Sequence, residues 1–396
     1  MNETDLKQSD WALSRGLMLL MAVTAGIGVA NLYYNQPLLA DIGHIFHTNA
    51  HQTGNISMFT QIGYAIGLFF FVPLADIKER RRFIVILLLC VTLSLIGVAT
   101  AQTMTWMYIA SLAVGITTIV PQIMLPLAAS LAPPKEQGKA IGTVSSGLLF
   151  GILLARTVSG LVGGTFGWRI MFWLAAVLML LLAVTLRLFL PKNEPDTTIT
   201  YKQLFQSIFT LVKQHGTLRE AAIIGAMMFG SFSAFWTSLT YFVEGPHYNF
   251  NSQIAGLFGL VGVVGASMAP IVGRAADRVK PKIIAGSLMA LTFFSFILFG
   301  TIGSFLWGLI IGIILLDLGI QGTQVANQSR IYPLAPHARS RLNTVFMVST
   351  FLGGALGSSL GSFAWKEWGW TGVCTTCCLM VACGLLVWLL GFRRRS

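Results

Sequence analysis

The chain contains 396 residues, of which 55% are hydrophobic and only 10% are charged, and its mean hydropathy is +0.74. A soluble domain of ordinary composition has about 25% charged residues, so these values exclude a soluble enzyme and predict an integral membrane protein. The formal net charge of +12 would suit a nucleic-acid partner. The position of the basic residues along the chain decides between these interpretations.

Successive apolar runs predict twelve transmembrane helices. A helix needs about 20 mainly apolar residues to cross the hydrocarbon core of a bilayer, and runs of about this length follow one another along the chain. Short polar gaps separate them. The predicted spans are residues 15–40, 54–75, 83–100, 106–131, 140–164, 170–190, 220–243, 253–273, 283–302, 305–328, 342–363 and 370–391.

The 26 Lys and Arg residues are concentrated in alternate gaps between these spans and at the two termini. The remaining loops contain only Arg169 and Lys366, and Arg156 lies inside a span. Because basic loops stay on the cytoplasmic side, we expect a multi-pass protein of the plasma (inner) membrane with both termini cytoplasmic. The basic excess then reflects topology, so the lipid bilayer is a predicted partner and a nucleic acid is not.

A short charged turn occurs twice, in the same relation to its flanking apolar runs. The first copy spans residues 72–82 and contains Asp76, and the second spans residues 273–282 and contains Asp277. The chain therefore contains an internal repeat, in which the second half repeats the pattern of the first. The predicted divisions are an N-terminal tail (1–14), a six-helix bundle (15–190), a cytoplasmic linker (191–219), a second six-helix bundle (220–391) and a basic tail (392–396).

The first span becomes polar in its second half. Asn31, Tyr34 and Asn35 are spaced by three and four residues and would share one helix face, from which Tyr33 points away. Polar groups at membrane depth face protein or a water-filled cavity, so this face is predicted to line a cavity, with interhelical hydrogen bonding as the alternative. The predicted substrate-binding residues are Asn31, Tyr34, Asn35, Gln61, Gln122, Trp236, Gln321 and Gln324.

Two ionisable residues stand alone inside apolar spans, Arg156 in the fifth and Asp317 in the tenth. An unpaired charge at the bilayer centre costs at least about 2.5 to 3.5 kcal/mol on insertion scales, and the depths of the two residues allow a meeting. We predict that Asp317 and Arg156 form the proton-coupling pair. A static pair that holds the bundles together is one alternative, and direct binding of an anionic solute by Arg156 is another.

Two further patterns predict packing. Small residues at 147, 151 and 155 recur every four positions, which favours the close approach of another helix. In the linker, residues 201–213 carry apolar side chains on one face, which predicts an amphipathic helix on the inner membrane surface.

Nothing in the sequence completes a metal site. His44, His47 and His51 have helical spacing, but no acid or thiol joins them, so solvated loop histidines are predicted. The five cysteines all lie in apolar runs, where small packing residues are the expected role. We expect no metal and no cofactor.

The charged turn and the twelve spans together resemble the major facilitator superfamily. The loop between the second and third spans of that family carries a Gly-x-Leu-Ala-Asp-Arg-x-Gly-Arg-Arg pattern. Leu74, Ala75, Asp76, Arg80 and Arg81 match it. The second copy of the turn keeps Gly273, Asp277, Arg278 and Lys282.

The resemblance covers nearly the whole chain. Residues 155–160, 167–169 and 317–330 are further similar to the arabinose-efflux-permease-like and drug:proton antiporter branch. The resemblance to the superfamily implies an all-α membrane fold of two pseudo-symmetric six-helix bundles that rock about a midplane site. The chain departs from the family pattern at Ser111, where an intramembrane arginine is expected. It also has Asp41 only at the outer edge, as the nearest acid to the first-span acid of many drug antiporters.

We therefore expect a monomeric secondary transporter, not an enzyme, that exports a small organic solute or drug in exchange for protons by alternating access. Proton symport of a polar metabolite stays open, and so does a membrane sensor or enzyme. The sequence has no Gly-x4-Gly-Lys-Ser/Thr loop, which argues against an ATP-driven pump. The paired charged turns predict conformational gates formed by Asp76, Arg80, Arg81, Asp277 and Arg278.

Overall fold

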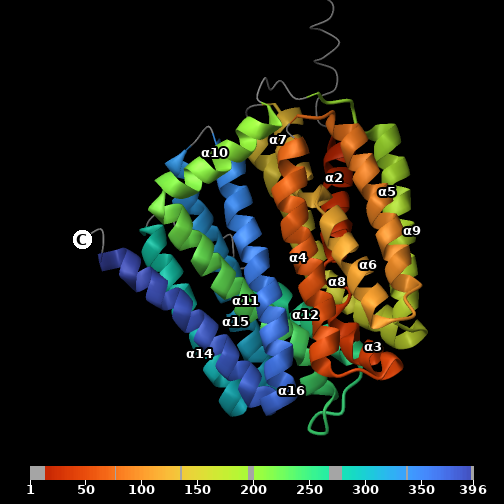
Figure 1. The fold of residues 1–396 in the computed structure, drawn as a ribbon, viewed down its shortest axis with the longest axis vertical. Helices are drawn as coiled ribbons and strands as arrows, with labels where there is room; N and C mark the ends of the chain where they lie inside the picture. Colours follow the sequence, from red (N-terminus) through yellow and green to blue (C-terminus); the bar gives the residue numbers. More distant parts are fainter. Residues whose placement is uncertain are drawn as a thin grey trace, which may run out of the picture.

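The computed structural model describes residues 14–75, 77–133, 136–194, 200–266, 279–335 and 338–393. Within these ranges the chain is helical apart from short turns (Figure 1). The α-helices are α2 (Arg15–Ala30), α3 (Leu39–Phe46), α4 (Ala50–Ala75), α5 (Arg80–Ala99), α6 (Met104–Thr117), α7 (Val120–Leu131), α8 (Gln137–Phe166), α9 (Trp168–Phe189), α10 (Tyr201–Gln214), α11 (Gly216–Glu244), α12 (Ser252–Ala266), α14 (Pro281–Ile302), α15 (Leu306–Ile331) and α16 (Arg339–Arg393), and the 3-10 helices are η1 (Gln36–Leu38) and η2 (Tyr332–Leu334).

Nine helices of the described residues are long and apolar enough to cross a membrane, with α6 and α7 taken together as Met104–Leu131. Two shorter apolar helices, Arg15–Ala30 and Ser252–Val264, accompany them. The segment α16 consists of two helices that meet at Gly369, whose backbone is not helical and whose φ of 60° is a conformation that residues with a side chain rarely adopt. These helices fit the twelve predicted passes, and the last two passes lie on either side of Gly369.

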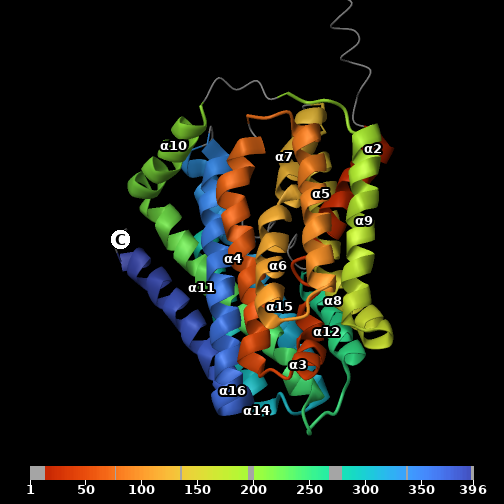
Figure 2. The ribbon, with the colours of Figure 1, turned by 45° about the vertical axis from the view of Figure 1, so that its right-hand side comes forward.

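The helices form two groups that lie side by side, with α2 to α9 in one and α11 to α16 in the other (Figure 1 and Figure 2). In the first group α2 packs on α8 and α4 packs on α6. In the second, α11 packs on α16 and α14 packs on α15. The contact between the first and fifth predicted spans thus recurs between the seventh and eleventh, and the predicted two-bundle fold is confirmed.

Glycines allow the backbones of paired helices to approach each other closely. Gly147 of α8 lies against the backbone of Ala22 in α2, and Gly151 lies against Gly26, with no space for a Cβ atom. The close approach that the small-residue spacing predicts is therefore confirmed, and α2 is the partner helix. Small residues let backbones approach where lipid offers no hydrophobic driving force for association.

The first predicted span is broken, so the prediction of one continuous helix over residues 15–40 is wrong. α2 ends at Ala30, residues 31–35 form turns, and η1 and α3 follow. Pro37 stands in the first turn of η1, where it cannot donate the backbone hydrogen bond that a continuing helix requires. Because the helix stops, the polar residues of this segment do not share one helix face.

The predicted amphipathic helix of the linker is confirmed as α10, which lies near the same end of the molecule as the start of α5 (Figure 1). Leu204, Ile208 and Leu211 are buried on one face. On another, the ring of Phe205 lies 5.0 Å from that of Phe69 in α4. The linker helix also contacts α11 and α16, so it touches both bundles.

The two bundles touch closely at the end opposite α10. Thr157 of α8 donates a hydrogen bond to the carbonyl oxygen of Gly256 in α12 at 3.0 Å, and Thr240 of α11 donates to that of Gln36 at 3.0 Å. A Cβ atom at Gly160 would lie 2.8 Å from the Cα atom of Gly256. The bundles are therefore in backbone contact at this end.

Candidate functional site

A cavity of about 650 Å³ lies between the two bundles. The first bundle contributes residues of α2, α4, α7 and α8 to its wall, and the second contributes residues of α11, α15 and α16. The wall extends to Arg80 at the start of α5 and Arg339 at the start of α16. We call this end of the molecule, which carries both arginines, the basic end, and the other the closed end.

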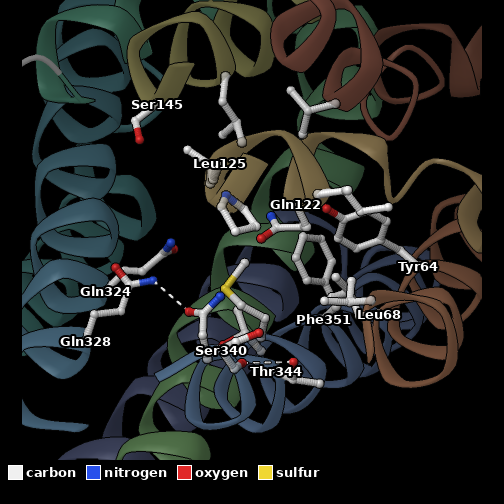
Figure 3. A pocket seen from close by; sticks show the side chains of 18 of the residues that line it. Tyr64, Leu68, Gln122, Leu125, Ser145, Gln324, Gln328, Ser340, Thr344 and Phe351 are labelled. Atoms are coloured by element: carbon white, nitrogen blue, oxygen red, sulfur yellow. Dashed lines mark hydrogen bonds between the residues drawn. The ribbon is translucent and has the colours of Figure 1, made fainter. Parts of the chain in front are cut away.

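Polar groups from both bundles face one another across this cavity (Figure 3). Tyr64 and Gln122 come from the first bundle, and Gln324 and Gln328 come from α15. Gln328 Nε2 donates a hydrogen bond to Asn343 Oδ1 in α16 at 3.3 Å. These groups interrupt a mostly apolar wall, which is typical of sites for small organic molecules.

The charged residues of the cavity wall are both cationic. Within the described residues, Arg80 and Arg339 line the cavity at the basic end and no acidic side chain lines it. Arg80 Nη1 also donates a hydrogen bond to Asn193 Oδ1 at 2.9 Å, which fastens the start of the linker to this turn. The charge that the described residues bring to the cavity mouth is therefore positive.

Three residues of the predicted substrate-binding set lie on the cavity, namely Gln122, Gln321 and Gln324. Gln61 does not, because its Nε2 donates to Ser358 Oγ in α16 at 3.0 Å and so joins the two bundles. Binding of a solute by the three glutamines stays a prediction.

The predicted cavity-lining residues of the first span, Asn31, Tyr34 and Asn35, face the interior of their own bundle. Asn35 Nδ2 donates to Thr60 Oγ1 at 3.3 Å, and its Oδ1 accepts from Ser57 Oγ at 3.2 Å. Asn31 Nδ2 lies 3.3 Å from the sulfur of Met179. These contacts, and the burial of Tyr34, correspond to the packing alternative rather than to a cavity lining.

Tyr33 lines the cavity instead, although helical spacing predicts that it points away. The break after Ala30 reverses that prediction, since turns at residues 31–35 change the direction of every following side chain. In the sequence, Pro37 indicates that the helix breaks in this segment. No sequence pattern predicts that Tyr33 lines the cavity.

Arg156 is 1% exposed and is held by aromatic rings and one amide. Its Nε donates to Gln36 Oε1 at 2.7 Å, and its guanidinium carbon lies 4.0 Å from the centre of the Trp236 ring and 5.0 Å from that of Tyr33. Phe232 is the third ring, at 5.3 Å. The two Nη atoms have no hydrogen-bond partner among the described residues. Cation–π contacts thus replace part of the lost hydration of this charge.

Asp317 is fully buried in α15, and neither of its carboxylate oxygens has a hydrogen-bond partner among the described residues. A Cβ atom at Gly262 of α12 would lie 2.9 Å from Oδ2, so a helix backbone covers one side of the carboxylate. Arg156 is near enough to interact with it electrostatically, but in the described part of the chain no ion pair joins them. Their coupling stays a prediction.

The structure describes only two of the five predicted gate residues, Arg80 and Arg81. Asp76, Asp277 and Arg278 lie outside the described residues. Arg80 lies at the cavity mouth, and Arg81 Nη1 donates to the carbonyl oxygen of Leu190 at 3.1 Å. Their role as gates stays a prediction.

A charged cluster near the basic end of the second bundle was missed in the sequence. Glu220 of α11 pairs with Arg330 of α15 at 2.5 Å and lies 3.6 Å from Lys282 of α14. Each of the three residues lies at the end of its apolar run, where a charge gives no unusual signal. The cluster ties three helices of the second bundle together.

Comparison with known proteins places this architecture in a family. Residues 18–337 match the family model of the Major Facilitator Superfamily. The chain is 42% identical to the uncharacterized transporter YgaY of Escherichia coli O157:H7 over 386 residues, which is 97% of this chain and 98% of that protein.

Solved structures show the same fold at low sequence identity. A bacterial homologue of the human lysosomal transporter Spinster, in an inward-facing and occupied conformation, matches with a TM-score of 0.74 and 13% identity over 95% of this chain and 96% of that chain. The nucleoside transporter NupG matches with a TM-score of 0.72 and 14% identity over 96% and 100%. The chain therefore belongs to the major facilitator superfamily and is a membrane transporter.

Proposed function

We propose that this transporter exports a small organic solute in exchange for protons by alternating access. The cavity between the bundles supports this proposal, because it extends to the basic end while Thr157 and Gly256 hold the bundles together at the closed end. If the basic end is cytoplasmic, as the distribution of Lys and Arg predicts, this conformation loads solute from the cytoplasm. Rocking of the two bundles would then present the same site to the other side.

One observation carries the proton step. Asp317 is a fully buried carboxyl group with two unpartnered oxygens, and it lies one helical turn from the cavity-lining Gln321. A carboxyl group in such surroundings binds a proton when no cation pairs with it and releases the proton when one does. Arg156 supplies a cation in the opposite bundle. Movement of one bundle against the other therefore changes the pairing of Asp317, which links rocking to proton binding.

The first prediction concerns proton flux. Full-length protein is reconstituted into vesicles loaded with a pH-sensitive dye, and a panel of apolar and amphipathic solutes is screened for those that drive proton movement. At saturating solute concentration, Asp317→Asn should still exchange solute across the membrane but should abolish solute-driven proton flux, because an amide carries no titratable proton. Thr323→Val, on the same helix, is the control and should keep both activities.

The sign of the flux separates the two modes of transport. Protons that move opposite to the solute support export by antiport, and protons that move with it support symport. Proton coupling that survives in Asp317→Asn would remove Asp317 as the carrier. Asp41 would then be tested next, because burial raises the pKa of its carboxyl group above the usual value, more than the hydrogen bond from Ser252 and the charge of His44 lower it. Glu244, at the end of α11, would follow.

A further inference from the structure

Arg156 and Asp317 lie just beyond the inner limit of the cavity, on helices from opposite bundles. On α8 the wall includes Leu148, Leu149 and Ile152, and Arg156 follows one turn later on the same face. On α15 the wall includes Gln328, Gln324 and Gln321, and Asp317 follows one turn beyond them, again on the same face. Arg156 and Asp317 therefore each follow the last wall residues of their own helix.

Helix α12 packs against both residues, and the charge of Arg156 is near enough to act on the carboxylate of Asp317. A Cβ atom at Gly259 would lie 3.0 Å from Arg156 Cβ, and a Cβ atom at Gly262 would lie 2.9 Å from Asp317 Oδ2. Residues three apart lie on one helix face, separated by about 4.5 Å along the axis. Arg156 and Asp317 thus approach the same face of α12 within about one helical turn of each other.

Among the described residues, neither charged group has a full set of hydrogen-bond partners. Gln36 binds only Nε of Arg156, and both Nη atoms lack a hydrogen-bond partner among the described residues. Both oxygens of Asp317 lack one as well. A buried polar group without a partner is strongly unfavourable, so two adjacent ones of opposite charge point to a ligand that supplies both a donor and an acceptor.

We propose that Arg156 and Asp317 form a subsite for a zwitterionic, amino-acid-like solute. The Nη groups of Arg156 donate to the carboxylate of the solute, and the oxygens of Asp317 accept from its ammonium group. The apolar side chain of the solute extends into the cavity, where Phe232, Phe229 and Leu148 line the wall. This assignment rests on the proposed transport function and names its substrate class.

The geometry favours a zwitterion over a simple anion or cation. An α-amino acid carries its carboxylate and ammonium on one carbon atom, which matches two protein charges that are close but not paired. An anion alone would leave Asp317 without a partner, and a cation alone would leave the Nη groups of Arg156 without one. A carboxylate and a planar guanidinium also form paired hydrogen bonds, which are stronger than neutral ones.

The same chemistry accounts for exchange with protons. The ammonium group of the solute and a proton compete for the oxygens of Asp317, so a bound zwitterion excludes the proton and a bound proton weakens the zwitterion. Competition of this kind drives movement of the two in opposite directions. Antiport then follows from one carboxyl group in the subsite, without a second proton site.

The second prediction uses a matched set of probes on the purified full-length protein in lipid nanodiscs. L-Phenylalanine carries both charges, phenylalaninamide lacks the carboxylate, and N-acetyl-phenylalanine lacks the ammonium; leucine, methionine and tryptophan with their corresponding derivatives complete the set. Binding is measured by calorimetry and by ligand-induced thermal stabilisation. At least one zwitterion should bind about tenfold or more tightly than both of its derivatives, as expected for the loss of one charged hydrogen bond.

Substitutions assign each end of the ligand. Arg156→Gln should remove the preference for the amino acid over its amide, and Asp317→Asn should remove the preference over the N-acetyl derivative. Arg156→Lys keeps the charge and should keep part of the first preference, which separates a binding role from a folding role. Glu220→Gln, which changes an acid in the same bundle away from the cavity, should leave both preferences unchanged.

The proposal is overturned if no zwitterion in the set binds more tightly than its two derivatives in the unsubstituted protein, since this comparison does not depend on any variant. It is also overturned if both preferences persist in Arg156→Gln and Asp317→Asn. Binding is measured without a proton gradient. Failure of the zwitterion preference with intact solute-driven proton flux would therefore contradict the subsite alone, and the reverse result would contradict the proton coupling alone.

Discussion

Asn35 and Tyr33 are two positions apart but face different parts of the protein. Asn35 binds Thr60 and Ser57 of α4 inside the first bundle, whereas Tyr33 lies between the cavity and Arg156. One residue therefore contributes to folding, and the other belongs to the site. The two roles predict different consequences of substitution.

The third prediction compares these residues. Asn35→Ala removes two buried hydrogen bonds, although Thr60 Oγ1 keeps its bond to the carbonyl oxygen of Ile56, so it should lower the free energy of unfolding by about 1 to 3 kcal/mol while the affinity for solute is retained. Tyr33→Leu keeps much of the buried volume but removes a ring 5.0 Å from the guanidinium carbon of Arg156, so it should weaken solute binding with a smaller loss of stability. Thermal unfolding and calorimetric binding of both variants test this. The reverse pattern would place Asn35 in the binding site.

The sequence identified unusual residues more reliably than it identified their neighbours. Arg156 and Asp317 stood out because a lone charge inside an apolar run has few harmless explanations. Of the rings that surround Arg156, Trp236 was predicted to bind solute, but none was predicted to contact Arg156. Tyr33 and Trp236 acquire their role from packing between distant segments, which single-sequence periodicity does not report.

At the level of helices, glycine determines how close the bundles come at the closed end. Gly160 of α8 meets Gly256 of α12, and Gly54 of α4 meets Ser362 of α16. Helix positions and the small-residue stripe were predictable, because both follow from local composition. The break after Ala30 was not predicted, because it depends on which backbone groups find partners in the folded protein.

The fourth prediction concerns Gly160. In Gly160→Ala the new Cβ atom would lie 2.8 Å from Gly256 Cα, so α8 and α12 must separate and the closed end becomes less stable. The population should shift toward opening at that end. A cysteine at Thr240, buried in this contact, should react about tenfold or more faster with a membrane-impermeant thiol reagent added from the closed side.

Gly142→Ala is the matched control for this shift, because its Cβ atom would have no neighbour within 4 Å although it lies on the same helix. Its labelling rate should equal that of the parent protein that carries only the cysteine at residue 240. Equal rates in Gly160→Ala as well would show that the glycine contact does not hold the closed end together.

At the level of the whole molecule, alternating access requires the closed end to open in each transport cycle. Gln253 of α12 and Thr165 of α8 lie at this end and share a hydrogen bond of 3.0 Å between Nε2 and Oγ1. They belong to different bundles, so the distance between them reports on the rocking motion. A covalent link between the two positions would hold the protein in the conformation described by the structure.

The fifth prediction uses this link. Thr165→Cys and Gln253→Cys, joined by a short bifunctional thiosulfonate reagent, should stop transport, and reduction should restore it. The cavity stays open at the basic end in the linked protein, so a cysteine at Gln328 should still react with a thiol reagent added from that side. Each single-cysteine variant treated with the reagent controls for the native cysteines and should transport normally. Transport by the linked protein at the rate of the unlinked one would mean that the bundles do not separate at this end, and the rocking mechanism would fail.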